Sequence, residues 1–378
     1  MAHPYRVLLV VGARPNFMKI APIVRELASY PDVIESRLVH TGQHYDAAMS
    51  DVFFGQLGIP RPDVDLGVGS DSQARQTAAI MTAFEPVLLD WRPDLVVVVG
   101  DVNSTLACAL VASKLGVQVA HVEAGLRSGD RRMPEEINRI LTDQLSDLLF
   151  VSEASGLENL RREGIADEKV FMVGNVMIDT LLAHRDKALA LDAPRSMGVE
   201  PRRYGVLTLH RPSNVDDICT LDRLFEGIAA IANEVPLLWP VHPRTRPALA
   251  RSAVIQQLVQ RGSIHLLAPQ GYLEFLSLMA ASRVVLTDSG GIQEETTVLG
   301  VPCLTLRTTT ERPVTITEGT NHLVGTDPAS IVAGWHAVQR GDAARRIPRY
   351  WDGRAAARIV DVITRHSAAV PAPVPVQV

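Results

Sequence analysis

Short apolar runs of strand length recur along the chain and alternate with stretches of helical pattern, and this alternation constrains the fold more than any other feature. Strands that alternate with helices form βαβ units, in which parallel strands make a sheet covered by helices. We expect two series of buried strands. The first comprises residues 7–12, 95–100, 117–123, 148–152 and 170–174, and the second comprises residues 204–210, 237–243, 264–269, 283–290 and 302–307.

The length of 378 residues exceeds one ordinary hydrophobic core and suits two domains. A less regular, charged stretch at 181–203 separates the two series, and we interpret it as the linker. The sequence therefore predicts an α/β fold of two doubly wound parallel-sheet domains, at 1–180 and 200–365. We expect the last helix to pack back on the first domain, and the Pro-rich tail at 366–378 to be disordered.

Composition excludes several classes of protein. The net charge of -5 argues against a dedicated nucleic-acid binder, and no apolar stretch is long enough to cross a membrane. We interpret the apolar run near the N-terminus as a strand, not a signal peptide. Cys108, Cys219 and Cys303 fit neither a metal pattern nor a disulfide framework, so we expect three core residues in a cytoplasmic protein.

Polar residues follow nearly every predicted strand, at the edge where ligands bind in open parallel sheets. Arg14 and Lys19 follow the first run, which suggests either a solvated loop or a negatively charged ligand. His210, Arg211 and His242 follow two runs of the second series. Since such residues come from both halves of the chain, we expect a central cleft faced by the two domains.

The segment from Asp288 to Glu295 follows a predicted strand and opens a helix, with Gly290 and Gly291 at the turn. Glycines let backbone N–H groups approach an anion closely, and a helix N-terminus favours negative charge. We interpret the turn as a diphosphate site and Glu295 as an acceptor for ribose hydroxyls; a plain capping turn is the alternative. The absence of GxGxxG after the first strand argues against NAD.

Several charged residues have both a structural and a functional interpretation. Arg312 either clamps a phosphate or sugar hydroxyl, or pairs with Glu311 on the surface. Taken alone, Asp101 is best explained as a helix N-cap. Glu123 has a similarly ordinary explanation as a partner of Arg127.

Glu135 and Arg139 lie four residues apart, on one face of a helix that begins near Pro134. They form either a surface ion pair or an acid and a cation aimed at the site. Together with Asp101 and Glu123, the first half thus offers three carboxylates grouped near cations. Proton transfer at a carbon next to a good leaving group needs this combination. No HExxH or similar spacing indicates a metal site.

Taken together, these motifs resemble those of a known family, the non-hydrolysing UDP-N-acetylglucosamine 2-epimerases. The matching motifs run in family order over nearly the whole chain. They are GARPNFMKIAP (12–22), HTGQHYD (40–46), GDVNST (100–105), HVEAGLRSGD (121–130), MPEEINR (133–139), GNVMID (174–179), LHRPSNVDD (209–217), PVHPRTR (240–246), APQGYLEF (268–275), TDSGGIQEE (287–295) and TTERPVT (309–315).

The resemblance implies the GT-B architecture, in which two Rossmann-like domains hold a nucleotide sugar. It implies reversible inversion at C2 of UDP-N-acetylglucosamine to give UDP-N-acetylmannosamine, without a redox cofactor or metal. An anti elimination of UDP would give a 2-acetamidoglucal, and UDP would add back after reprotonation from the other face. It further implies a homodimer whose product feeds polysaccharide synthesis.

The resemblance also assigns roles to residues that match the family motifs. The catalytic candidates are Asp101, Glu123, Glu135, His210, Lys19 and Arg139. The substrate-binding candidates are Arg14, Phe275 (against the uracil), Ser289, Gly290, Gly291, Glu295, Arg312 and His242.

One loop departs from the family pattern. Ser213 stands where many relatives carry an acid, and Asp216 and Asp217 follow in the same loop as acids able to compensate. Some family members bind a second UDP-N-acetylglucosamine as an activator. The matching allosteric candidates here are Gln43, His44 and Arg211, beside His242.

Other functions share parts of this pattern. They are a 2-epimerase of a modified UDP-sugar (a 2,3-diacetamido uronic acid), a GT-B glycosyltransferase, a hydrolysing epimerase and a UDP-sugar sensor without chemistry. Three carboxylates favour epimerisation over transfer, and residues 121–130 resemble the non-hydrolysing branch. A sensor has no need of Asp101, Glu123, Glu135 and His210 together.

Overall fold

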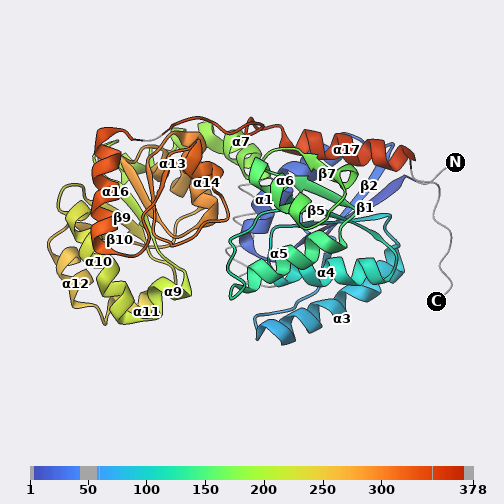
Figure 1. Cartoon of the computed structure of the whole chain (residues 1–378), viewed down its shortest axis with the longest axis horizontal. Helices are drawn as coiled ribbons and strands as arrows, with labels where there is room; N and C mark the ends of the chain where they lie inside the picture. The colour runs from blue at the N-terminus through green and yellow to red at the C-terminus, as the bar shows by residue number, and fades with distance from the viewer. Residues whose placement is uncertain (1–3, 43–57, 59, 343, 370–378) are drawn as a thin grey trace. The chain divides into compact units, whose positions relative to one another are not determined.

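The computed structural model describes residues 4–42, 58, 60–342 and 344–369, and it divides into two compact units (Figure 1). Unit 1 contains residues 1–180 together with 349–378, and unit 2 contains residues 181–348. Each unit has its own parallel sheet, so the predicted α/β class with two parallel-sheet domains is confirmed.

Unit 1 is built on a parallel sheet whose described strands have the order β3-β2-β1-β4-β5-β6-β7. The strands are β1 (Tyr5–Val11), β2 (Ile34–His40), β3 (Val64–Asp65), β4 (Leu95–Val99), β5 (Gln118–Ala124), β6 (Leu148–Val151) and β7 (Val170–Met172). The helices are α1 (Arg14–Leu27), α3 (Gln73–Trp91), α4 (Asn103–Lys114), α5 (Pro134–Leu145), α6 (Ala154–Arg162), the 3-10 turn η1 (Asp167–Lys169) and α17 (Ala355–Ala369). The helix α7 (Val176–Ala190) begins in unit 1 and continues into unit 2.

The central strands β1 and β4 of unit 1 are mostly apolar because helices cover both faces of the sheet. Leu8 on β1 and Val96 on β4 belong to a core cluster with α3 and α4. Their neighbours Leu9 and Val97 point to the other face and are equally buried. Figure 1 shows α3, α4 and α5 on one side of this sheet and α1 and α17 on the other.

Several hydrogen bonds hold the C-terminal segment in unit 1. The indole N–H of Trp351 donates to the carbonyl of Ser152 at 2.9 Å. The carboxylate of Asp179 accepts the backbone N–H groups of Ala355 and Ala356, at 3.1 and 2.7 Å, at the start of α17. This carboxylate therefore satisfies donors that a helix N-terminus otherwise leaves without partners.

Unit 2 has a second parallel sheet with the order β10-β9-β8-β11-β12-β13. Its strands are β8 (Gly205–Thr208), β9 (Leu237–Pro240), β10 (Ile264–Leu267), β11 (Val284–Thr287), β12 (Cys303–Thr305) and β13 (Asn321–Leu323). Its helices are α8 (Ala193–Ser196), α9 (Pro212–Val215), α10 (Ile218–Ala232), α11 (Arg246–Leu249), α12 (Ala253–Gln260), α13 (Tyr272–Ala280), α14 (Gly290–Leu299), α15 (Val314–Thr317) and α16 (Pro328–Arg340). Leu207, Phe225, Trp239 and Trp335 are among its core side chains.

Three local expectations are wrong. The stretch at 181–203, expected to be an irregular linker, begins inside the helix α7 and also contains α8. The helix α17 continues to Ala369, so the first residues of the expected disordered tail are helical. Cys108 and Cys303 are buried as expected, whereas Cys219 is exposed.

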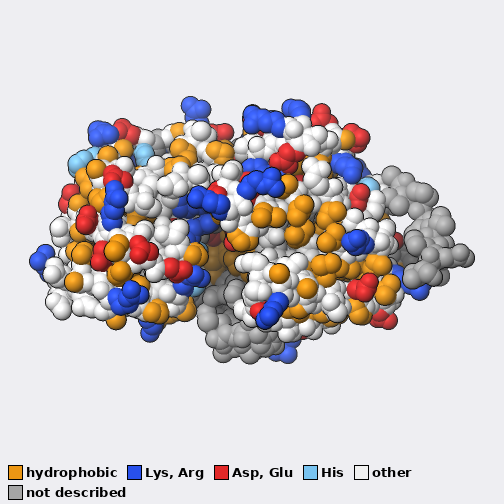
Figure 2. Space-filling view, turned by 60° about the horizontal axis from the view of Figure 1, so that its bottom comes forward, with side chains coloured by type: hydrophobic (Ala, Val, Ile, Leu, Met, Phe, Trp, Pro, Cys, Tyr) orange, Lys and Arg blue, Asp and Glu red, His pale blue; other side chains and the backbone are white. Residues whose placement is uncertain are grey.

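Acidic and basic side chains both occur across the molecular face shown in Figure 2. Within the described ranges, each helix is too short or too polar to span a lipid bilayer.

Candidate active site

The strand order of each sheet reverses direction at one point, and ligands of doubly wound folds bind there, outside the carboxyl ends of the strands. In unit 1 the reversal lies between β1 and β4, and in unit 2 it lies between β8 and β11. Lys19 and Asp101 follow the two strands at the first point, and His210 and Ser289 follow those at the second. Candidate residues of both units thus gather where each sheet offers a binding edge.

Lys19 and Glu123 form a buried ion pair in unit 1. The Nζ of Lys19 lies 2.5 Å from Oε2 of Glu123, and the two side chains are 10% and 3% exposed. The pairing of β5 with β6 shifts register between Val122 and Ala124, and Glu123 has a φ of +70°. Such an irregularity re-aims a side chain and is typical of functional sites. Arg127, the alternative partner of Glu123, pairs with Asp143 and Glu163 instead.

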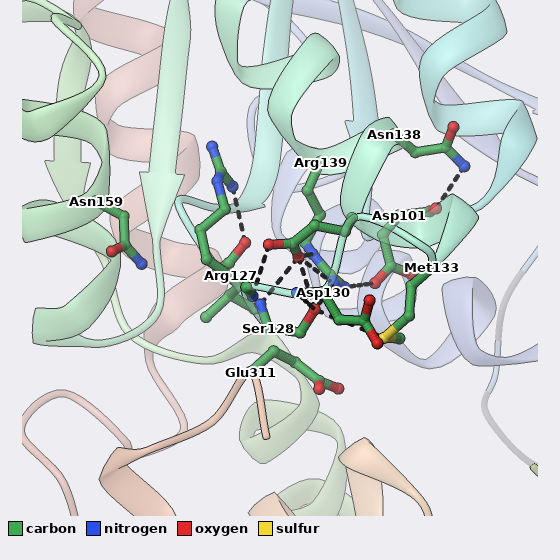
Figure 3. A network of polar contacts seen from close by, with 12 residues as sticks. Asp101, Arg127, Ser128, Asp130, Met133, Asn138, Arg139, Asn159 and Glu311 are labelled. Carbon is green, nitrogen blue, oxygen red and sulfur yellow. Dashed lines mark hydrogen bonds and ion pairs between the residues drawn. The ribbon is translucent and has the colours of Figure 1, made fainter. Parts of the chain in front are cut away.

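Asp101 does not cap a helix, because α4 begins at Asn103 with Val102 at its N-cap. Its carboxylate instead pairs with the guanidinium of Arg139 on α5 (Figure 3). Arg139 also donates to Oε2 of Glu136, at 2.6 Å from Nη2. Of the two explanations for Glu135 and Arg139, the surface ion pair is therefore not the one found, since Arg139 pairs with Asp101 and Glu136.

Glu136, which the sequence analysis missed, organises the loop before α5. Its oxygens accept the backbone N–H groups of Ser128 and Gly129, each at 2.9 Å. Burial raises the pKa of Glu136, but the hydrogen bonds from Ser128, Arg139 and Gly129 outweigh it and lower the pKa overall. Its neighbour Glu135 is half-buried and makes no hydrogen bond or ion pair with another described residue.

Two further buried residues of unit 1, His121 and Asp143, were not predicted. The ring nitrogen Nδ1 of His121 lies 2.6 Å from Oδ1 of Asp143, and its Nε2 lies 2.8 Å from the carbonyl oxygen of Gly100. Arg127 pairs with Asp143 at 2.7 Å and with Glu163 at 2.6 Å.

In unit 2, Asp288 at the end of β11 holds the loop that follows β8. Its fully buried carboxylate accepts the backbone N–H groups of His210 and Arg211, and Nδ1 of His210 lies 2.9 Å from it. Burial raises the pKa of Asp288, but the contacts with His210 and the backbone lower it overall. The ring of His210 remains 40% exposed and available to a ligand.

The predicted anion turn opens the helix α14 as expected. Ser289 occupies the N-cap without a capping hydrogen bond from its side chain to a described residue, and α14 begins at Gly290. Ser289, Gly290 and Gly291 are half-buried. A Cβ at Gly290 would lie 2.6 Å from Oε1 of Glu311, so a side chain at this position would displace that carboxylate. The turn therefore presents backbone N–H groups at a helix N-terminus, the arrangement that binds anions.

Glu295 lies further along α14 and is 4% exposed. The hydroxyl of Tyr272 on α13 donates to its Oε1 at 3.2 Å. Burial raises the pKa of Glu295 to about 7, against a smaller lowering by that hydrogen bond. Phe275 lies one turn after Tyr272 on α13 and is half-buried.

Arg312 is not a surface residue, because only 6% of it is exposed. Its guanidinium pairs with Glu294, so the alternative of a surface pair with Glu311 is not the one found. Glu311 accepts from Arg307 at 2.8 Å and lies 3.9 Å from Arg211. Burial raises the pKa of Glu311, but Arg312 and Arg307 lower it well below its usual range.

The remaining candidates in unit 2 are His242 and the two acids that follow Ser213. His242 is exposed, and its ring centroid lies 5.7 Å from that of His210. The acids expected to compensate for Ser213 have other roles: Asp216 pairs with Arg244 at 2.6 Å, and Asp217 caps α10.

Some predicted site residues fall outside what the structure describes. Gln43 and His44 lie outside the described residues, and Arg14 is described only through its backbone, as the first residue of α1. The described ranges hold no group of three or more His, Cys, Asp or Glu residues placed to hold a metal ion.

Comparison with known proteins decides the family. The sequence model of the family described as UDP-N-acetylglucosamine 2-epimerase matches residues 25–364. The chain belongs to this family of enzymes.

The epimerase family includes relatives that align with nearly the whole chain. The UDP-N-acetylglucosamine 2-epimerase of Methanocaldococcus jannaschii is 41% identical over 95% of this chain and 99% of its own. A crystal structure of the enzyme from that organism, in complex with UDP-GlcNAc and UDP, is 40% identical, covers 95% of this chain and 99% of its own, and has a TM-score of 0.87. The neighbours of this fold are thus GT-B epimerases. The UDP-2,3-diacetamido-2,3-dideoxy-D-glucuronate 2-epimerase of Pseudomonas aeruginosa is 40% identical over 95% of this chain and 99% of its own.

Proposed function

We propose that this enzyme interconverts UDP-N-acetylglucosamine and UDP-N-acetylmannosamine without hydrolysis, redox cofactor or metal. The observation that carries the proposal is the grouping of acids at the binding edge of unit 1. Asp101 and Glu123 each pair with a cation, Arg139 or Lys19, and Glu135 makes no polar contact with another described residue. Acids in such different surroundings can exchange protons with opposite faces of one carbon.

The proposed reaction is an anti elimination followed by re-addition. A carboxylate of this group takes the C2 proton, and the C–H electron pair becomes the C1–C2 double bond. The C1–O bond breaks at the same time, and UDP leaves with its electron pair as an anion that nearby cations stabilise. The 2-acetamidoglucal then receives a proton on the opposite face of C2 while UDP re-forms the bond to C1. Protons and electrons balance, so the reaction needs no co-reactant.

In the proposed complex, unit 2 holds the nucleotide. The diphosphate binds to Ser289, Gly290 and Gly291, and Glu295 accepts the ribose hydroxyls. Phe275 lies against the uracil, and Arg14, His210, His242 and Arg312 contact the ligand. Support comes from the half-buried helix N-terminus and from the 40% exposed His210 ring. Gln43, His44 and Arg211 form the proposed activator site, in a cytoplasmic homodimer.

A second substrate has a specific observation in its favour. The Pseudomonas aeruginosa relative, named for a 2,3-diacetamido uronate, is nearly as similar to this chain as the Methanocaldococcus jannaschii enzyme. The same chemistry at C2 would serve either sugar, since the reacting carbons are alike. We therefore propose UDP-2,3-diacetamido-2,3-dideoxy-D-glucuronate as the alternative substrate.

Product analysis tests the proposal. Purified enzyme is incubated with each UDP-sugar without added NAD or metal, and the products are identified by proton NMR. We expect the C2 epimer, still attached to UDP, in a mixture that is the same from either direction. Free N-acetylmannosamine with UDP would instead indicate a hydrolysing enzyme. Unchanged spectra for both sugars, with UDP shown to bind, would refute epimerisation of either.

A further inference from the structure

We infer that Asp143 is a positioning residue that braces the two turns carrying Asp101 and Glu123, a role that rests on the proposed function. Asp143 lies on α5, its side chain is fully buried, and no step of the proposed reaction uses it. Its two carboxylate oxygens reach two different turns at the carboxyl end of the sheet. The brace thus sets how the two proposed acid/base groups lie relative to each other.

The first arm of the brace runs through His121. Oδ1 of Asp143 lies 2.6 Å from Nδ1 of His121, and Nε2 of the same ring lies 2.8 Å from the carbonyl oxygen of Gly100. A carbonyl only accepts, so Nε2 carries a proton and donates. The Gly100 carbonyl belongs to the peptide that joins Gly100 to Asp101. Holding that carbonyl therefore fixes the peptide plane from which Asp101 projects.

The second arm is direct. Oδ2 of Asp143 accepts the backbone N–H of Gly125 at 3.0 Å, two residues beyond Glu123. Arg127 also contacts Oδ2, at 2.7 Å, and this cation offsets the buried negative charge. Burial raises the pKa of Asp143, but His121 and Arg127 lower it overall, which keeps the group a carboxylate that accepts on both sides.

The turn around Glu123 contains backbone that does not hold its shape unaided, whereas its neighbouring glycines adopt a positive φ without strain. Gly100 has a φ of +69°, Glu123 a φ of +70° and Gly125 a φ of +80°. A left-handed conformation at a glutamate persists only where the surroundings enforce it. The β5 register shift at Glu123 adds a second irregularity at the same place. One buried carboxylate bonded on both sides of this segment supplies that enforcement.

Two substitutions of His121 form a matched pair for the test. In His121→Gln the amide nitrogen takes the place of Nε2 and still donates to the Gly100 carbonyl. In His121→Asn the shorter amide keeps the contact with Asp143 but does not reach that carbonyl. Both remove the imidazole and keep one of its two donors: His121→Gln keeps the donor to Gly100 and loses the donor to Asp143, and His121→Asn does the reverse. Glu163→Gln is the control, since it removes a charge from the outer end of Arg127 and leaves both arms intact.

We expect His121→Asn to lower kcat about 100-fold, because a misplacement of about 1 Å costs a factor of this size. KM and the calorimetric affinity for UDP should stay within about threefold, since the nucleotide is held by unit 2. His121→Gln should keep kcat within about tenfold of the wild type, and Glu163→Gln within about twofold. Equal losses of kcat in the two His121 variants would show a merely structural role. So would a lower kcat that comes together with a higher KM and a lower melting temperature.

Backbone amide hydrogen exchange, measured without substrate, tests the brace independently of the proposed function. Peptides covering residues 99–103 should exchange faster in His121→Asn than in His121→Gln, with no substrate present. Peptides covering 123–127 should exchange faster in Asp143→Ala. Unaltered protection in these variants would overturn the brace even if the enzyme is an epimerase. A wild-type enzyme that epimerises neither UDP-sugar would refute the proposed function, and the exchange rates would then decide the brace alone.

Discussion

The carboxyl group of Glu295 makes the stability of unit 2 depend on pH in a way that one substitution should remove. Its pKa rises from 4.5 to about 7 on burial in the folded protein. Between these values the folded state binds more protons than the unfolded state, so the free energy of unfolding falls as the pH rises. The difference corresponds to about 3 kcal/mol at about 1.4 kcal/mol for each pKa unit.

Glu295→Gln replaces the group by a neutral side chain of the same shape, to which Tyr272 can still donate. We expect the variant to be no more stable than the wild type near pH 4.5 and about 3 kcal/mol more stable above pH 7. Urea unfolding across this range measures the difference, with tryptophan fluorescence as the probe. Glu226→Gln, at an exposed position on α10, is the matched control. A difference that does not change with pH would refute the reasoning.

Three other predictions follow from the site. Binding of UDP near pH 6 should release protons from the enzyme, because ribose hydroxyls that donate to Glu295 favour its ionised form. Calorimetry in buffers of different ionisation enthalpy measures the number of protons released, and no release would contradict the ribose contact. Lys19→Met should cost about 3–5 kcal/mol of stability, because it removes the cation from a buried pair. The double variant Lys19→Met, Glu123→Gln should recover most of this loss, and equal losses in the single and double variants in urea unfolding would argue against a strong pair. Gly100→Ala should lower the melting temperature more than Gly116→Ala. Both glycines have a positive φ, but only a Cβ at Gly100 would meet Lys19, at 2.8 Å from Nζ, and equal effects would disprove that contact.

The sequence was a good guide to the strands with continuous apolar runs. Each of the ten predicted runs contains a strand. The central strands are mostly apolar because both of their faces are buried, and the partly exposed edge strands β7 and β10 still carry short apolar runs. The missed strands β2, β3 and β13 lie toward the edges of their sheets. β2 carries Glu35 and Arg37 in its middle, and β3 and β13 have only two and three residues. Local pattern is weakest where pairing with a neighbouring strand determines the structure.

The sequence left the ion-pair partners open, because sequence neighbours are not the nearest charges in the folded chain. Arg312 stands next to Glu311 but pairs with Glu294, and Glu123 pairs with Lys19, 104 residues away. Only the assembled sheets bring these groups together. A contact that depends on the order of parallel strands leaves no local trace in the sequence.

One signal in the sequence of α5 could have identified the missed residues. Glu136, Arg139 and Asp143 repeat at helical spacing and are buried, whereas Ile137 and Leu141 are 41% and 45% exposed. The helix thus turns its charged stripe inward, the reverse of an ordinary surface helix. Charged side chains on a helix are usually solvated, so the buried stripe is not the ordinary expectation for such residues. A charged stripe three and four residues apart, next to recognised site motifs, indicates a buried polar network.

The most direct test of the proposed function is the fate of the C2 proton. Wild-type enzyme is incubated in deuterated water with UDP-N-acetylglucosamine, and the deuterium content at C2 is followed by NMR in the recovered substrate and product. The proposed elimination predicts that all UDP-N-acetylmannosamine carries deuterium at C2 and that the substrate pool gains it as equilibrium is approached. Product that retains the original proton at C2 would contradict removal of that proton by a carboxylate that exchanges with solvent.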